Sequence, residues 1–232
     1  MDRSLSDRLL QLAEPEYREF TQRLIPDGKP LLGVRMGSIR SIAKELAKSN
    51  RWNPQTLGDP TEDQYHEEKL VRFLALAYAT IEEEERLVLL ERMLDHLDNW
   101  ALCDSLSSTL KETAKYPTIY RDFIRRHLHD KRPYACRFAI VLILNHFMTP
   151  NWIEDNLALL EQVKRDHYYI RMAVAWAIAT AFTVSPSVVL TWFGTTTMDI
   201  ETLRMAGQKI RDSKRVSPED KKRTTALLQS RK

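Results

Sequence analysis

The sequence predicts an all-α protein, built as a superhelical solenoid of about six stacked helix pairs. A short pattern returns six times, at steps of 32, 32, 33, 34 and 33 residues. Of the 232 residues 43% are hydrophobic and only 6 are glycine, so the chain can bury a core but has few of the breakers that an all-β protein needs. Units of this period share one continuous core, so we expect residues 1–232 to form a single elongated domain with a concave groove. Whether the basic segment 214–232 is ordered stays open.

The elements follow in chain order from hydrophobic periodicity. A short helical pair is expected over 5–24, and each later unit is expected to be an outer helix, a turn and an inner helix that begins at the repeated residue. In 137–147 and 170–182 apolar residues cover nearly the whole circumference, which predicts inner helices packed between neighbours. The amphipathic stretch 151–165 predicts an outer helix. Most prolines fall where turns are required: Pro26, Pro30, Pro54, Pro60, Pro117, Pro133, Pro150, Pro186 and Pro218.

One of the six repeated positions differs from the others in charge. Five hold arginine and one holds aspartate: Arg40, Arg72, Asp104, Arg137, Arg171 and Arg204. A repeat scaffold does not by itself produce this exception, so Asp104 is the first candidate for chemistry. Arginines at equivalent positions also bridge neighbouring units, which favours a structural role for most of them. Asp104 itself has an alternative role as a hydrogen-bond acceptor for Arg72 or Arg137.

Several classes of protein are disfavoured by composition. The longest apolar run, 138–144, is far shorter than the roughly 20 residues that cross a bilayer, and the N-terminus lacks the pattern of a secretory signal. Cys103 and Cys136 both have apolar neighbours, so we expect buried thiols in a cytoplasmic protein. The six histidines show no metal-ligand spacing, and no glycine-rich phosphate loop is present, so neither metal nor cofactor is expected. The segment His66-Glu67-Glu68 is interpreted as a solvated helix face.

Basic charge is concentrated in two segments although the net charge is only +3. Residues 204–232 hold ten Lys or Arg against three acids, and residues 121–137 hold six against two. A basic face on a nearly neutral protein is typical of proteins that bind phosphate backbones, but a solvated surface fits the charge equally well.

Two tryptophans join Asp104 in the candidate site. Trp100 and Asp104 are four residues apart, so they share one face of a helix. If the units stack in order, Asp104, Arg137 and Trp176 come from three consecutive inner helices and converge on the concave groove. Trp52, Trp152 and Trp192 fit packing positions and are given no functional role.

These segments resemble one known family. Asn99-Trp100-Ala101-Leu102-Cys103-Asp104-Ser105, Arg137 within Ala135–Val141 and Trp176 within Ala173–Ile178 look like the signature of the HEAT-like repeat DNA alkylation repair proteins, the AlkD-type alkylpurine glycosylases. Leu32-Gly33-Val34 followed by Arg40 resembles the N-terminal motif of that family. The similarity extends over residues 15 to 215.

The resemblance implies a function. Active members of the family hydrolyse the N-glycosidic bond of N7-alkylguanine and N3-alkyladenine in duplex DNA, without a cofactor and with the damaged base left largely stacked. It also implies a catalytic role for Asp104, supported by Trp100 and Trp176, and a phosphate contact for Arg137. The remaining basic residues expected to bind DNA are Arg171, Arg204, Lys209, Arg211 and Lys214. A curved array long enough to cradle double-stranded DNA needs no second subunit, so we expect a monomer.

Two alternatives remain open at this stage. A catalytically silent relative would bind DNA with the same groove, and a protein-interaction scaffold would bind a helix or peptide there. Leu24 bears on the choice, because it stands where active members of the family tend to carry an aromatic residue that approaches DNA.

Overall fold

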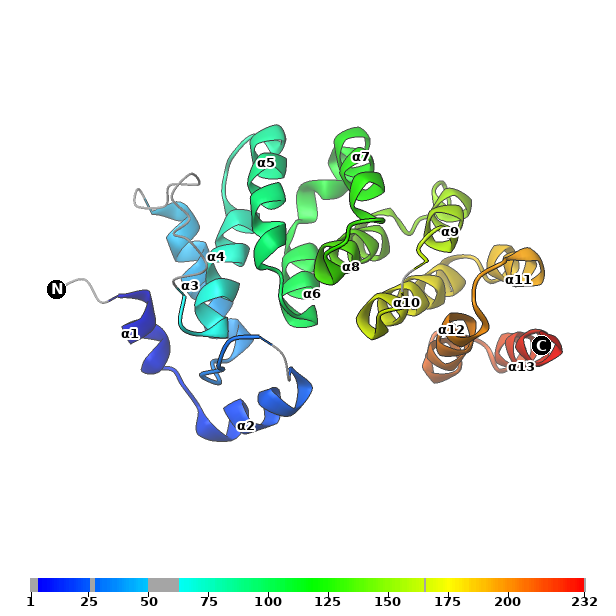
Figure 1. Cartoon of the computed structure of the whole chain (residues 1–232), viewed down its shortest axis with the longest axis horizontal. Coiled ribbons are helices and arrows are strands. Elements are labelled where there is room, and N and C mark those ends of the chain that lie inside the picture. The colour runs from blue at the N-terminus through cyan, green and yellow to red at the C-terminus, as the bar shows by residue number, and fades with distance from the viewer. Residues whose placement is uncertain (1–3, 26–27, 50–62, 165, 232) are drawn as a thin grey trace. The chain divides into compact units, whose positions relative to one another are not determined.

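The computed structural model describes residues 4–25, 28–49, 63–164 and 166–231, and all regular structure within these ranges is helical (Figure 1). The predicted all-α class is therefore confirmed. Two compact units divide the chain, Met1–Leu110 and Lys111–Lys232. The single domain and the superhelical solenoid stay predictions, because each concerns the chain as a whole. Trp52, Pro26, Pro54 and Pro60 lie outside the described residues.

The first unit stacks its longer helices in a row. Its α-helices are α1 (Leu5–Leu10), α2 (Pro15–Leu24), α3 (Met36–Lys48), α4 (His66–Tyr78), α5 (Glu83–Met93) and α6 (Trp100–Thr109), with the 3-10 turn η2 (Leu94–His96) before α6. Helices α3, α4 and α6 pack against one another in this order, while α5 and α1 pack on α4 (Figure 1). The predicted N-terminal helical pair is confirmed as α1 and α2.

The second unit repeats this arrangement. Its helices are α7 (Pro117–His127), α8 (Pro133–Leu142), α9 (Ile153–Glu161), α10 (Tyr168–Val184), α11 (Pro186–Thr195), α12 (Ile200–Asp212) and α13 (Pro218–Ser230), with short 3-10 and π segments η3 (Lys111–Lys115) and η4 (Ile143–Phe147). Helices α8, α10 and α12 form its row, with α7 on α8, α9 and α11 on α10, and α13 on α11 and α12. Helix α13 lies within the segment whose order the sequence left open.

The inner helices begin earlier than predicted. Each repeated charged residue lies three to six residues inside its helix instead of at the first position. Local capping sets these starts: the Asn99 side chain accepts a hydrogen bond from the Leu102 N–H, Asp199 accepts one from the Thr202 N–H, and Pro133 occupies the first turn of α8. The repeated residues therefore project from the second turn, beside the neighbouring helix.

Most of the repeated arginines bridge neighbouring helices. Arg40 on α3 donates to the Tyr78 hydroxyl of α4 at 3.0 Å and to Thr109 Oγ1 of α6 at 2.9 Å. Arg171 on α10 pairs with Glu201 of α12. Arg72 instead pairs with Asp63, which precedes α4. These contacts favour the structural interpretation of the repeated arginines.

The core is as apolar as the periodicity predicts. Every residue of α8 from Ala135 to Leu142 is buried, Arg137 included, and both cysteines are buried, as predicted. Within the described ranges, the helices fall short of the length and apolar character that crossing a membrane requires. Trp152 stacks under the Arg121 guanidinium at 4.1 Å, and Trp192 donates to Glu161 at 3.3 Å, so both serve packing as predicted.

Candidate functional site

Helix α6 brings Trp100 and Asp104 to one cavity. Trp100 is the first residue of the helix and Asp104 lies one turn later on the same face, as the spacing predicts. Both side chains are partly exposed, and both line a cavity of about 210 Å³ in the first unit. Asp104 therefore lines the same cavity as the indole of Trp100, in agreement with the predicted shared helix face.

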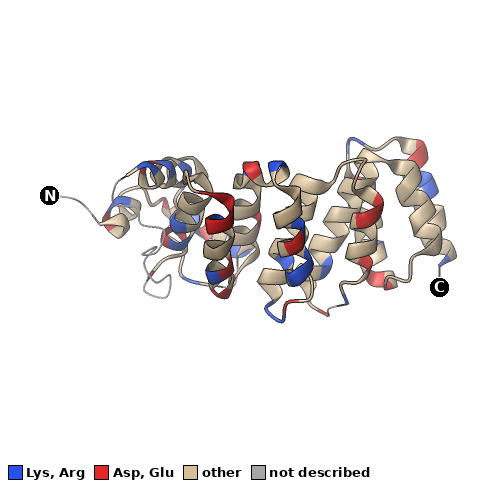
Figure 2. Ribbon diagram, turned by 90° about the horizontal axis from the view of Figure 1, so that it is seen from above, with Lys and Arg blue, Asp and Glu red and all other residues tan. Residues whose placement is uncertain are grey.

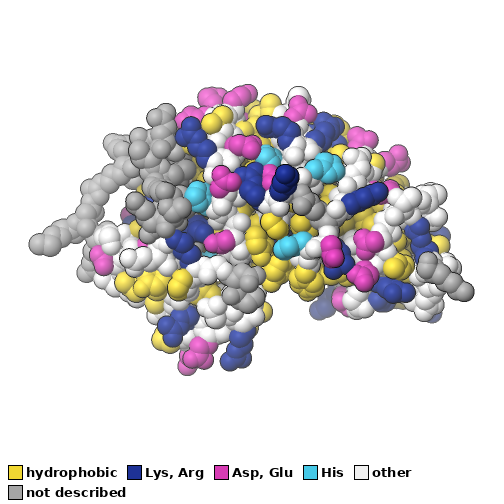
Figure 3. Space-filling view, viewed as in Figure 1, with side chains coloured by type: hydrophobic (Ala, Val, Ile, Leu, Met, Phe, Trp, Pro, Cys, Tyr) yellow, Lys and Arg dark blue, Asp and Glu magenta, His cyan; other side chains and the backbone are white. Residues whose placement is uncertain are grey.

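Helix α2 supplies the other wall of this cavity. Its lining is mostly apolar and comes from α2, the segment before α3, α3, α4 and α6: Tyr17, Phe20, Leu24, Ile25, Leu31, Val34, Met36, Ile39 and Leu70, with Thr21, His66, Glu67, Ala101 and Ser105. Phe20 is 57% exposed and Leu24 is 49% exposed. Figure 3 shows hydrophobic side chains on the surface in this part of the molecule. We name this space the α2–α6 cavity.

Trp100 ties α2 to α6. The indole Nε1 donates to the Leu24 carbonyl at 3.0 Å, at the C-terminal end of α2. This bond fixes the indole ring and places Leu24 at the cavity. The sequence singled out position 24, and the structure places Leu24 in the lining of the same cavity as Asp104.

The Leu-Gly-Val motif holds α2 in place through a carboxylate. The backbone N–H groups of Leu32, Gly33 and Val34 donate to Glu67 of α4 at 2.9, 2.8 and 3.3 Å. Gly33 has φ +84°, and a Cβ there would lie 2.5 Å from the Glu14 carbonyl at the start of α2. The motif needs glycine for both reasons.

The prediction that His66, Glu67 and Glu68 form a solvated helix face is wrong. All three are buried, with exposed fractions of 4%, 2% and 4%. The carboxylate of Glu67 accepts the three backbone hydrogen bonds just described, which satisfy its oxygens in the interior. Glu68 accepts from the Gln64 and Tyr65 N–H groups at 2.7 and 2.9 Å, which caps α4. Sequence spacing carries no sign of Glu67 because its donors lie more than thirty residues away.

Trp176 lies in a basic cavity of the second unit. The indole, on α10, is 38% exposed and lines a space of about 490 Å³. The other lining residues come from α10, α12 and the turn before α13: Ala179, Thr180, Thr183, Lys209, Asp212, Ser213, Lys214 and Arg215. The Arg215 N–H donates to Ser213 Oγ at 3.2 Å, whereas the side-chain nitrogens of Lys209, Lys214 and Arg215 make no hydrogen bond or ion pair with another described residue. We name this space the Trp176 cavity.

The surroundings of the Trp176 cavity lower the pKa of Lys209. Burial lowers the pKa of its ammonium group from the usual value, the nearby guanidinium of Arg137 lowers it further, and Asp212 opposes both. An anion beside Lys209 would relieve this repulsion. The structure thus brings together Trp176, Lys209 and Lys214, three residues singled out in the sequence. It adds Arg215, which the basic composition of the C-terminal segment includes but did not distinguish.

The other predicted DNA-binding arginines have varied environments. Arg137 is 5% exposed and donates to the Tyr169 carbonyl at 2.7 Å, so it joins α8 to α10. Arg171 is engaged by Asp166 and Glu201. Arg204 is exposed, and Arg211 donates to Gln208 at 2.6 Å. Basic and acidic residues occur along both units (Figure 2). The predicted convergence of Asp104, Arg137 and Trp176 joins residues of both units and stays a prediction.

The sequence predicts no metal site, and a metal site would need a cluster of ligating side chains. Within the described part of the chain, no three His, Cys, Asp or Glu side chains gather in a way that holds a metal ion.

Comparison with known families identifies the class of protein. Residues 5–211 match the family described as DNA alkylation repair enzyme, and the chain belongs to this family. The match includes the whole α2–α6 cavity and all of the Trp176 cavity except residues 212–215. Membership confirms the suspected resemblance and supports a role in DNA repair, with DNA as the substrate. No curated protein matches the sequence significantly.

Proposed function

We propose that this protein is a DNA glycosylase that hydrolyses the N-glycosidic bond of cationic alkylated purines, N7-alkylguanine and N3-alkyladenine, in duplex DNA. The observation that carries the proposal is the pairing of Asp104 with Trp100 on the wall of the α2–α6 cavity, in a chain of the DNA alkylation repair enzyme family. The damaged base stays largely stacked, as the family resemblance implies.

The chemistry needs one carboxylate and little else. An alkylated purine already carries positive charge, so it leaves without strong acid catalysis. Positive charge then builds on the deoxyribose in an oxocarbenium-like transition state, the kind that carboxylates stabilise in glycoside hydrolysis. Asp104 stabilises that charge and orients or deprotonates the attacking water. Trp100 and Trp176 present electron-rich ring faces to the same cationic sugar.

The Trp176 cavity supports the DNA-binding part of the proposal. Lys209, Lys214 and Arg215 line the same cavity as the exposed indole of Trp176, and phosphate oxygens of a DNA strand match this set of donors. Arg171, Arg204 and Arg211 add positive charge on α10 and α12, and Arg137 on α8 contacts a phosphate near the lesion, as the family resemblance implies. We propose that the two rows of helices continue as one HEAT-like solenoid with a concave groove, acting as a cytoplasmic monomer without a cofactor.

A single-turnover excision assay tests the proposed function. The full chain is mixed in excess with duplex oligonucleotides containing one N7-methylguanine or one N3-methyladenine, and released base is measured against a sample without protein. Release well above the spontaneous rate supports the proposal. Tight, salt-sensitive duplex binding with release at the spontaneous rate contradicts it and identifies a silent DNA-binding relative.

One observation favours a second candidate function. Phe20 and Leu24 leave apolar surface exposed on α2, and such surface is typical of protein-interaction sites. A scaffold would bind a helix or peptide there. Its affinity for duplex DNA would be weak, whereas the binding proposed here is strong and falls steeply with salt because phosphate contacts release counterions.

A further inference from the structure

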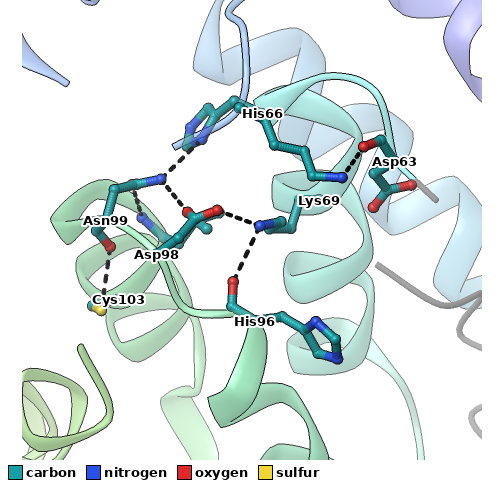
Figure 4. Close-up of polar contacts among 9 residues, drawn as sticks. Asp63, His66, Lys69, His96, Asp98, Asn99 and Cys103 are labelled. Carbon is teal, nitrogen blue, oxygen red and sulfur yellow. Dashed lines mark hydrogen bonds and ion pairs between the residues drawn. The ribbon is translucent and has the colours of Figure 1, made fainter. Parts of the chain in front are cut away.

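His66 is a buried histidine that the proposed chemistry does not use. It is the first residue of α4 and lines the α2–α6 cavity together with Trp100 and Asp104. Its Nδ1 lies 3.2 Å from the amide nitrogen of Asn99, the residue that caps α6 (Figure 4). The contact therefore connects a titratable group directly to the helix that carries both site residues.

The partners of Asn99 decide the protonation state of His66. Asn99 Oδ1 must face the Leu102 N–H, from which it accepts a hydrogen bond at 3.1 Å. Its amide group then points the other way, and one N–H donates to Asp98 Oδ1 at 2.7 Å. The second amide hydrogen is directed at His66 Nδ1, which must accept it. His66 is therefore neutral in this arrangement, with its proton on Nε2.

The surroundings of Asn99 leave it little freedom to adapt. It is 1% exposed, and its backbone carbonyl accepts from the Cys103 thiol at 3.3 Å. Asp98 is held by the buried ammonium group of Lys69, which also donates to the His96 carbonyl at 3.2 Å (Figure 4). A proton on His66 Nδ1 would place two hydrogen-bond donors, this N–H and the Asn99 amide N–H, against each other. Asn99 could turn its amide group away only by losing the hydrogen bond that it accepts from the Leu102 N–H.

We propose that His66 is a positioning residue: its neutral imidazole fixes Asn99 and through it the first turn of α6, so protonation of His66 displaces Trp100 and Asp104. The catalytic consequence rests on the proposed glycosylase function, but the displacement does not. The site is then assembled when His66 is neutral and loosened in acid.

The charges around His66 set the direction of this response. Burial lowers the pKa of His66 below its usual 6.5; the carboxylates of Glu67 and Asp98 raise it, and Lys69 lowers it. Glu67 belongs to α4 like His66 itself, Asp98 precedes α6, and from α6 and α2 the ionisable Asp104 and Tyr17 share the cavity. Because burial is the largest of these effects, the pKa of His66 lies below its usual value and the neutral form persists below pH 6.5.

Two substitutions separate positioning from packing. His66→Asn puts an amide oxygen near the place of Nδ1, so it keeps the acceptor and cannot titrate. His66→Phe fills the space but offers no acceptor at any pH. His96→Asn is the matched control, since His96 lies in the same unit and reaches this network only through its carbonyl.

The displacement is measured on the full chain labelled with 5-fluorotryptophan, the Trp100 fluorine resonance being assigned from Trp100→Phe. As the pH is lowered from 8 to the onset of acid unfolding, we expect this resonance to move in one transition with a midpoint below 6.5 in the wild type and in His96→Asn. In His66→Asn it should stay at its high-pH position, and in His66→Phe near its low-pH position throughout. A Trp100 resonance that does not titrate in the wild type, or that still titrates in His66→Asn, overturns the proposal.

Single-turnover excision adds the functional readout. We expect the wild-type rate to fall about tenfold or more across the same transition, because small displacements of reacting groups cost much of the rate. In His66→Asn the excision rate should not fall in this way as the pH is lowered. If no variant excises at any pH, the proposed function fails while the fluorine titration still decides the positioning role. If His66→Phe does not fold, the comparison with His66→Asn still decides it.

Discussion

The carboxylate of Glu67 accepts a hydrogen bond from the N–H of Gly33 at 2.8 Å and joins the start of α4 to the segment that leads from α2 into α3. The N–H groups of Leu32 and Val34 also donate to this carboxylate, and we call the three N–H groups the Glu67 cradle. Since α2 forms one wall of the α2–α6 cavity and α6 the other, this buried contact helps to determine the space that Asp104 faces.

Replacing Gly33 by alanine should destabilise the protein by about 2 kcal/mol or more. The left-handed backbone costs a side chain roughly 1–2 kcal/mol, and the new Cβ would meet the Glu14 carbonyl at 2.5 Å. Urea unfolding measures the effect. Gly37→Ala is the matched control, because nothing lies within 4 Å of its Cβ and it is in α3; there we expect no loss, or a gain of up to about 1 kcal/mol. Equal effects of the two substitutions would contradict this account of the motif.

Replacing Glu67 by glutamine tests the cradle itself. The single amide oxygen cannot serve all three N–H groups, and the new NH₂ group faces donors, so we expect a loss of about 1–3 kcal/mol in the free energy of unfolding. Glu84→Gln, on the exposed face of α5, should change it by no more than about 0.5 kcal/mol. A similarly small change for Glu67→Gln would show that the N–H groups find other partners.

Asp130 predicts a pH dependence of stability in the second unit. The guanidinium of Arg132 donates to its carboxylate at 2.9 and 2.5 Å, and this holds the pKa of Asp130 well below its ordinary 3.8. A carboxyl whose folded pKa is lowered stabilises the protein above its unfolded pKa and loses that contribution as the pH falls toward the folded one. Asp130→Asn should therefore be less stable than the wild type by roughly 1–3 kcal/mol at pH 7. The difference should shrink below pH 3.8, and a difference that stays constant from pH 5 to 2.5 in urea titrations would exclude this mechanism.

Lys209 tests the proposed phosphate contact of the Trp176 cavity. Lys209→Gln should weaken duplex binding and reduce the slope of log affinity against log salt by about 1, the signature of one lost phosphate contact. Fluorescence anisotropy with a labelled duplex at several salt concentrations gives both quantities. Lys222→Gln removes the same charge from an exposed position on α13 and should leave the slope nearly unchanged. If both variants lower affinity equally with no change in slope, Lys209 does not contact a phosphate.

Periodicity could predict much of this fold. Spacing alone placed Trp100 and Asp104 on one helix face, and the nearly continuous apolar run 137–147 correctly indicated a helix buried on all sides. Helix starts were misplaced because capping by residues such as Asn99 depends on local backbone geometry that a repeat pattern does not contain.

The polar interior was beyond prediction for a different reason. Three consecutive polar residues, His66, Glu67 and Glu68, read as a solvated face, yet each finds partners brought in from elsewhere in the chain. Hydrogen-bond donors from distant segments cancel the cost of burying such groups, and no local signal reports them. Arg215 was not distinguished from the other cations near the C-terminus because the cavity that it lines forms only where α10 and α12 pack together, which composition does not report.

The central claim is that Asp104 carries the chemistry, and Asp104→Asn tests it most directly. Single-turnover release of N7-methylguanine from a duplex oligonucleotide is measured beside duplex affinity in the same preparation. The account predicts release at the spontaneous rate with duplex affinity close to that of the wild type. An Asp104→Asn protein that releases the base as fast as the wild type would contradict it.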